Sequence, residues 1–315
     1  IGASFGGHLG VTTSSGPGIA LKGEALGYAA ILELPLVVIN VQRGGPSTGL
    51  PTKTEQSDLM QALYGRNGEA PIPVVAPCTP SDCFDVIYEA ARIAVEHMTP
   101  VFFLSDGYIA NGSEPWSFPL AKDLVPIKVK KLSAGGDDEK YRPYVRNEKL
   151  VRDWAIPGVK GLEHRVGGLE KENETGNVSY DPANHELMVK LRAKKVANIS
   201  DTIPDQNIEI GEDSGKVLVL GWGSTFGACK TAVTELVKDG VEVSQAHVRY
   251  LNPLPKNLGD LISRFDKVLV PEINDGQFVK LIRDKYLVDA IPFNKIMGIP
   301  FSSQEIKEKV LEILG

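Results

Sequence analysis

Short apolar, β-branched runs alternate with longer amphipathic or small-residue stretches in the first third of this 315-residue chain. The runs are LVVINV at 36–41, IPVVA at 72–76 and VFFL at 101–104. Parallel strands need crossover connections and are buried on both faces. The alternation therefore predicts a parallel sheet covered by helices.

One crossover helix is well marked, in the stretch CTPSDCFDVIYEAARIAVEHM at 78–98. Thr79 is a suitable cap and Pro80 suits the first helical position, because proline needs no hydrogen bond there. Four apolar residues follow at helical spacing: Phe84, Ile87, Ala91 and Ala94. We expect this helix to begin near Pro80 and to pack against the sheet.

The same pattern returns near the end of the chain. Residues 216–255 contain an apolar strand, a glycine turn, an amphipathic helix and a second strand, and a further strand and a final helix are predicted at 267–273 and 303–314. The predicted fold class is therefore α/β, with two parallel-sheet domains. We expect these domains to span residues 1–120 and 214–315.

A polar region, residues 121–213, is expected to connect the two domains. Lys, Glu, Asn, Gly and Pro are frequent there, and one helix is predicted at 181–199. Lysines and arginines between residues 128 and 152 are interleaved with acids. This mixture favours a solvated surface over a phosphate site.

Charge and cysteine content narrow the possible partners. The net charge of −6 provides no broad basic field, so we expect neither nucleic acid nor an anionic membrane as a partner. No apolar stretch reaches the roughly 18–20 residues that span a bilayer. Three scattered cysteines suit a reducing cytoplasm. The chain begins IGASFGGHLG, without Met, and we expect an upstream part to precede it.

Two glycine-containing turns are the candidate binding sites. In TTSSGPG at 12–18, Ser15, Gly16 and Gly18 precede a helix-compatible run that begins at Ile19. Small residues at such a turn allow another backbone or a planar ligand to approach closely. Plain chain reversal explains the same residues, so this turn alone leaves both interpretations open.

The second turn, QRGGPSTGLPTKTEQ at 42–56, follows a predicted strand and contains Arg43. Its guanidinium suits a carboxylate or phosphate, and the two glycines let a ligand reach the backbone. An ion pair with Asp58, Glu55 or Glu33 is the alternative, and the sequence leaves both open. No histidine has an acid or nucleophile at a telling spacing, so we predict no catalytic or metal-ligating residue.

Taken together, these stretches resemble a known family. TTSSGPGIALKGEALGYAAILELPLVVINVQRGGPSTGLPTKTEQSDL is similar to the thiamine-diphosphate pyrimidine-binding domain in the α subunit of 2-oxoacid:ferredoxin oxidoreductases, most closely the 2-oxoglutarate branch. The resemblance continues through DGYIANGSEPW at 106–116 and residues 161–196. HVRYLNPLP at 247–255 is similar to the transketolase C-terminal-like domain of that subunit.

The resemblance implies a specific reaction: oxidative decarboxylation of a 2-oxoacid to acyl-coenzyme A and CO₂, with electrons passed to ferredoxin. It implies that Arg43 and Thr52 bind substrate and that Ser15, Gly16 and Gly18 bind thiamine diphosphate. The cofactor and Mg²⁺ would be shared with a partner β subunit, which would also hold an iron–sulfur cluster. Decarboxylation chemistry belongs to the cofactor.

Two family features are not matched in this chain. The glutamate that activates the pyrimidine and a Tyr-Pro-Ile-Thr-Pro-like stretch would both lie upstream of Ile1, and Glu24 does not match the glutamate's position. We therefore expect no turnover from this chain alone. Two alternatives remain: another thiamine-diphosphate enzyme component, such as a transketolase-like or 2-oxoacid dehydrogenase component, and a noncatalytic assembly subunit.

Overall fold

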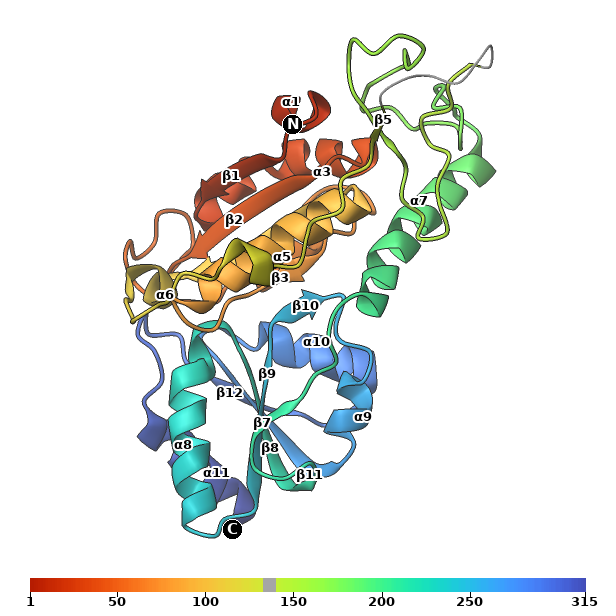
Figure 1. The fold of residues 1–315 in the computed structure, drawn as a ribbon. Coiled ribbons are helices and arrows are strands. Elements are labelled where there is room, and N and C mark those ends of the chain that lie inside the picture. Colours follow the sequence, from red (N-terminus) through yellow and green to blue (C-terminus); the bar gives the residue numbers. More distant parts are fainter. Residues whose placement is uncertain (133–139) are drawn as a thin grey trace.

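Two five-stranded sheets organise the chain, and their helices and connections are drawn in Figure 1. The structure is a computed structural model that describes residues 1–132 and 140–315. Both sheets are mainly parallel, and each has one antiparallel strand at an edge. The predicted α/β class with parallel-dominated sheets is confirmed.

The first sheet has the strand order β1-β2-β4-β3-β10. Its strands are β1 (Gly10–Ser14), β2 (Leu36–Gln42), β4 (Pro100–Asp106), β3 (Val74–Val75) and β10 (Tyr250–Asn252). The three predicted apolar runs form β2, β3 and β4, and every residue of β4 is buried. Strand β10 comes from far along the chain and pairs antiparallel with β3. The expected domain division at residues 120 and 213 stays a prediction.

Six helices accompany this sheet: α1 (Gly2–Phe5), α2 (Gly16–Ala20), α3 (Gly23–Leu32), α4 (Leu59–Tyr64), α5 (Asp82–His97) and α6 (Gly107–Asn111). Helix α5 begins at Asp82, so Pro80 does not occupy its first position as predicted. The Thr79 hydroxyl still accepts a hydrogen bond from the Asp82 amide, at 3.2 Å. The buried face of α5 consists mainly of Val86, Ala90, Ile93 and Ala94. The predicted residues Ile87 and Ala91 lie one position further along the chain than Val86 and Ala90.

The second sheet has the order β12-β11-β8-β9-β7. Its strands are β7 (Ile208–Ile210), β8 (Gly215–Trp222), β9 (Val243–Val248), β11 (Phe265–Glu272) and β12 (Ile291–Asn294). Helices α8 (Phe226–Lys238), α9 (Leu258–Ile262), α10 (Gln277–Tyr286) and α11 (Ser303–Leu314) accompany it. A capping box between Ser302 and Glu305 begins α11 where the sequence predicted a helix.

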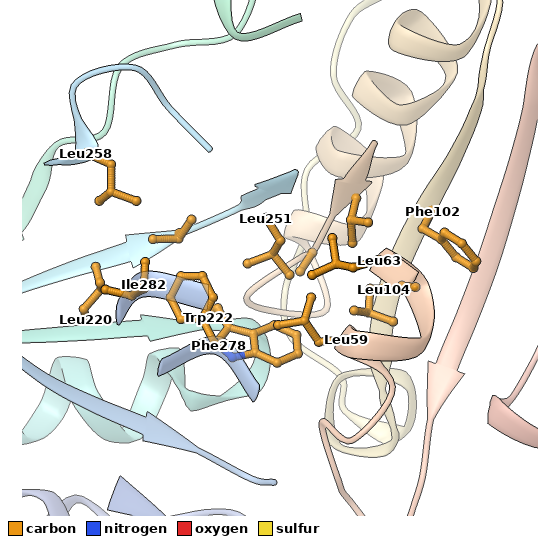
Figure 2. Packing of buried hydrophobic residues seen from close by; sticks show 14 of the residues in the cluster. Leu59, Leu63, Phe102, Leu104, Leu220, Trp222, Leu251, Leu258, Phe278 and Ile282 are labelled. Carbon is orange, nitrogen blue, oxygen red and sulfur yellow. The ribbon is translucent and has the colours of Figure 1, made fainter. Parts of the chain in front are cut away.

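One hydrophobic core continues from the first sheet into the second. Figure 2 shows Leu59 of the first unit next to Trp222 and Phe278 of the second, and Leu104 belongs to the same buried cluster. The Trp222 and Phe278 ring centroids are 6.4 Å apart. Because apolar burial is shared across the boundary, the two sheets stabilise each other.

The connecting region contains the predicted helix, α7 (Pro182–Ala197), and a small pair of strands, β5 (Lys131–Leu132) with β6 (Trp154–Ala155). Among the described residues there are also three 3₁₀ turns: η1 (Ala121–Asp123), η2 (Asn198–Asp201) and η3 (Gly223–Thr225). Asp181 caps α7 by accepting a hydrogen bond from the Asn184 amide, at 2.7 Å. The prediction of this helix is confirmed.

The prediction that the basic residues between 128 and 152 form a solvated surface is wrong for Arg146 and Arg152, which are buried. Arg146 forms an ion pair with Glu33, at the carboxyl end of α3. Lys195 of α7 donates to the other Glu33 oxygen at 2.6 Å and to the Met98 carbonyl at 2.9 Å. One buried carboxylate therefore ties the connecting region to the first sheet.

The electrostatics of Glu33 follow from this arrangement. Burial by itself raises the pKa of the Glu33 carboxyl, but the charges of Lys195, Arg146 and Arg152 outweigh burial and lower the pKa to about 2. Sequence spacing cannot reveal such a contact, since Glu33 and Lys195 are 162 positions apart.

Candidate cofactor and substrate site

The candidate site lies at the carboxyl ends of three neighbouring parallel strands. Strand β1 ends at Ser14, β2 at Gln42 and β4 at Asp106, and these strands are adjacent in the sheet. Carboxyl ends of parallel strands share one edge, which is the usual ligand position in α/β sheets. In Figure 1 this edge faces the second sheet.

The first turn starts directly after β1. Ser15 has an extended backbone, and α2 begins at Gly16, three residues before the predicted start at Ile19. Gly16 is buried, and a Cβ added to it would lie 2.6 Å from an Asp58 carboxylate oxygen. At Gly18 an added Cβ would clash with the Ser14 hydroxyl. Only glycine allows these close approaches.

Asp58 joins the two turns that the sequence analysis treated separately. Its carboxylate accepts a hydrogen bond from Asn40 Nδ2 at 3.0 Å, and its amide donates to Gln42 Oε1 at 2.9 Å. Burial raises the pKa of the Asp58 carboxyl, and the nearby charge of Glu55 also raises it. From sequence, Asp58 was expected only as an ion-pair partner of Arg43, and this role was not predicted.

Arg43 follows β2 directly and is half-buried. Among the described residues its Nε is buried without a hydrogen-bond partner. The three acids proposed as ion-pair partners are engaged elsewhere: Glu33 with Arg146 and Lys195, Asp58 with Asn40, and Glu55 with the Gly45 amide and the Ser57 hydroxyl. None of these three acids therefore neutralises the Arg43 guanidinium.

The loop after Arg43 folds back on itself. The Gly44 amide donates to the Lys53 carbonyl at 3.0 Å, and the Leu50 amide donates to the Gly44 carbonyl at 2.8 Å. Thr52 lies in this folded loop, is exposed, and has a positive φ of 70°. The backbone pairing brings the residues that flank Thr52 beside those that follow Arg43.

Gln56 anchors the end of this loop to the second sheet. Its side chain donates to the Trp222 carbonyl at 2.8 Å and accepts from the Ile273 amide at 3.0 Å. The Gln56 amide also donates to the Ile273 carbonyl, at 2.8 Å. Sequence reasoning missed Gln56, because its partners lie more than 160 positions away. The loop is thus held at both ends.

Two further buried carboxylates border the site. Asp106 caps α6 by accepting hydrogen bonds from the Tyr108 and Ile109 amides, and Glu272 accepts from the Phe278 and Val279 amides at the start of α10. Burial raises the pKa of both carboxyls. Their backbone partners show that both stabilise helix starts.

Gly16 offers a direct test of the close approach beneath the first turn. If Gly16 binds thiamine diphosphate as the family resemblance implies, Gly16→Ala is expected to weaken binding of that cofactor by the complete enzyme about tenfold or more, because the new methyl group must displace Asp58. Titration calorimetry of the assembled enzyme with the cofactor measures the effect. Gly27→Ala in α3 is the matched control, since its Cβ would meet only Asn67 Oδ1 at 3.7 Å. Equal affinities of wild type and Gly16→Ala would contradict a role for this turn.

Residues 1–132 and 140–315 contain no helix with the length and apolar character needed to cross a membrane. In the same residues, no group of three or more His, Cys, Asp and Glu side chains is arranged to hold a metal ion.

The chain is similar in sequence to a known family and to several known proteins. Residues 1–181 match the family described as "Pyruvate flavodoxin/ferredoxin oxidoreductase, thiamine diP-bdg". The chain is 53% identical to 2-oxoglutarate oxidoreductase subunit KorA of Mycobacterium tuberculosis, over 97% of this chain and 46% of that protein. It is 34% identical to 2-oxoglutarate synthase subunit KorA of Archaeoglobus fulgidus, over 100% of this chain and 81% of that protein.

A solved structure agrees with these relatives. The 2-oxoglutarate:ferredoxin oxidoreductase of Magnetococcus marinus, with 2-oxoglutarate, coenzyme A and succinyl-CoA bound, superposes with a TM-score of 0.92 and 34% identity. The match covers 100% of this chain and 55% of that one. The chain thus spans about half the length of the Mycobacterium and Magnetococcus proteins. The family match, the identities and the shared fold together establish that the chain belongs to the α subunits of the 2-oxoacid:ferredoxin oxidoreductases.

Proposed function

We propose that this chain is the substrate-orienting part of an enzyme that oxidatively decarboxylates a 2-oxoacid, in particular 2-oxoglutarate. The products are acyl-coenzyme A and CO₂, and the electrons pass to ferredoxin. The observation that carries this proposal is the guanidinium of Arg43, which is half-buried at the end of β2 and paired with none of the acids expected from sequence, Asp58 and Glu55 included. A partly buried guanidinium without a counter-charge favours binding of a carboxylate, which every 2-oxoacid carries.

The choice of 2-oxoglutarate rests on the relatives. The Mycobacterium and Archaeoglobus proteins are named for 2-oxoglutarate, and the Magnetococcus structure has that acid bound. This chain spans about half the length of two of these proteins, and our proposal extends the activity of the whole enzyme to it.

We assign substrate binding to Arg43 and Thr52 and thiamine diphosphate binding to Ser15, Gly16 and Gly18. The cofactor assignment is supported by the match of residues 1–181 to a thiamine diphosphate-binding family and by the place of this turn at the carboxyl end of β1. When bound, the cofactor supplies the electron sink that decarboxylation requires. Arg43 and Thr52 hold the substrate in place, and such positioning lowers the barrier without new covalent chemistry.

A partner β subunit is the proposed source of the remaining parts of the enzyme. Several relatives are named as subunits, which implies a multi-subunit enzyme. We assign to the β subunit the Mg²⁺ site, the pyrophosphate-binding residues and an iron–sulfur cluster. Cytoplasmic location remains our prediction.

The experiment that tests this function uses the full-length protein co-purified with its β subunit. The assay follows coenzyme A-dependent reduction of a viologen dye with thiamine diphosphate and Mg²⁺. We expect 2-oxoglutarate to be used faster than pyruvate or 2-oxoisovalerate. If a complex that binds the cofactor reduces the dye with none of these acids, the oxidoreductase assignment is wrong. Another thiamine chemistry or a noncatalytic assembly role would then take its place.

A further inference from the structure

Helix α4 begins directly after Asp58, but this aspartate does not cap it. An aspartate that precedes a helix normally accepts a hydrogen bond from one of the first helical amides. The Asp58 side chain makes no such bond. Its carboxylate instead accepts from Asn40 Nδ2 at 3.0 Å and lies against Gly16, in the first turn of the candidate site. The amides at the start of α4 therefore need another partner.

Gln277, from the second unit, provides this partner. Its Oε1 accepts a hydrogen bond from the Met60 amide at 2.9 Å, and its Nε2 donates to the Ser57 carbonyl at 2.7 Å. The Ser57 carbonyl precedes Asp58 in the chain and the Met60 amide follows it. One side chain thus caps α4 in place of Asp58 and also holds the backbone on both sides of that residue.

Gln277 is itself held in place by its neighbours. It is half-buried at the first position of α10, and its amide donates to Asn274 Oδ1 at 2.9 Å. Asn274 Nδ2 donates in turn to the Gln56 carbonyl at 2.8 Å. Figure 2 shows the starts of the two helices in contact, with Leu59 of α4 next to Phe278 of α10. The hydrogen bonds of Gln277 therefore start from an ordered and buried part of the second unit.

We propose that Gln277 is a positioning residue for thiamine diphosphate binding; this inference rests on the proposed function. By capping α4, Gln277 leaves the Asp58 carboxylate to Asn40 and to the first turn. Asp58 in turn lies against Gly16, where even one added carbon atom would be too close to its carboxylate. The position of the first turn therefore depends on Asp58, and the position of Asp58 depends on a side chain of the second unit.

Gln277→Met, in the full-length protein assembled with its β subunit, is expected to weaken thiamine diphosphate binding about tenfold. Methionine resembles glutamine in length and helix propensity but makes neither hydrogen bond. Loss of two ordinary hydrogen bonds corresponds to about one order of magnitude in affinity. Without them, Asp58 can turn back to cap α4 and withdraw its carboxylate from the first turn. Titration calorimetry with thiamine diphosphate measures this affinity without relying on turnover.

Two further variants separate positioning from stability. Gln277→Glu keeps an oxygen for the Met60 amide and should regain part of the lost affinity. Gln304→Met is the matched control and should bind like wild type, since Gln304 is exposed near the start of α11 and its amide donates to Glu308 of the same helix, at 2.8 Å. Thermal unfolding without cofactor is measured for each variant. A purely structural role of Gln277 would lower the melting temperature but leave the affinity of the folded protein unchanged.

Equal affinities of wild type and Gln277→Met would overturn the inference and leave the proposed function standing, whatever the melting temperatures. Failure of the proposed function is a separate result. A wild-type complex that binds thiamine diphosphate but turns over no 2-oxoacid would contradict the proposed function, and weaker binding by Gln277→Met would still support the positioning role. A wild-type complex that binds no thiamine diphosphate would overturn both.

Discussion

Replacing Arg43 with alanine in the complete enzyme is expected to lower kcat/KM for 2-oxoglutarate by about two to three orders of magnitude. Removing one partner of a desolvated, hydrogen-bonded charge pair typically costs about 2–5 kcal/mol, and each 1.4 kcal/mol is about tenfold. The effect is large because no other cation of residues 42–58 can replace the charge of Arg43. The other cation in this stretch, Lys53, is exposed, whereas Arg43 is half-buried.

The control variants separate charge from geometry. Arg43→Lys keeps the charge but loses the planar fork, so we expect partial activity. Lys53→Ala removes an exposed cation from the same loop and should leave kcat/KM near the wild-type value. Steady-state kinetics with the viologen assay measures all three variants. Wild-type turnover by Arg43→Ala, in a complex that retains its cofactor, would refute substrate binding by Arg43 and favour the assembly role.

Glu33→Gln is expected to destabilise the protein by about 3–5 kcal/mol, because it leaves buried cations without their carboxylate. Lys195 and Arg146 are both buried against Glu33, and neither has another acidic partner among the described ion pairs. Urea-induced unfolding monitored by circular dichroism measures the loss. Glu24→Gln, at an exposed position in the first turn of the same helix, should shift stability by less than about 0.5 kcal/mol.

The pH dependence of the stability provides a second test of the role of the Glu33 charge. The pKa of Glu33 is lowered from 4.5 to about 2 in the folded protein, so its stabilising contribution is present above pH 4.5 and is lost as the pH falls toward 2. The glutamine variant lacks this contribution. The difference between the urea midpoints of wild type and Glu33→Gln should therefore shrink between these two pH values. A constant difference would indicate that packing, and not charge, accounts for the loss.

The local elements of the fold could be predicted from sequence. Strands β2, β4, β8 and β11 are apolar and β-branched, and α7 and α11 carry recognisable capping residues, so their neighbours in sequence suffice to define them. The short strands β7, β10 and β12 were not predicted, because runs of three or four residues carry little periodic signal.

The candidate residues of the site could also be identified from sequence, but their surroundings could not. Arg43 and Gly16 follow apolar runs, and parallel strands place such positions at one edge. Glu33 could be excluded as a partner of Arg43 only in three dimensions, because it precedes β2 while Arg43 follows it, and its own partners come from residues 146 and 195. The link between the two turns depended on Asp58, and the anchoring of the loop depended on Gln56.

By itself, the sequence determined the α/β class, the main strands and the family, because these depend on periodicity and on motifs that lie within one stretch of chain. Only the tertiary structure decided that Glu33 is buried among cations, that Arg43 is left without these acids, and that β10 joins the first sheet. Each of these results depends on contacts between residues far apart in the chain. The free energy of a buried charge is set by the groups packed around it, and local sequence does not encode which groups those are.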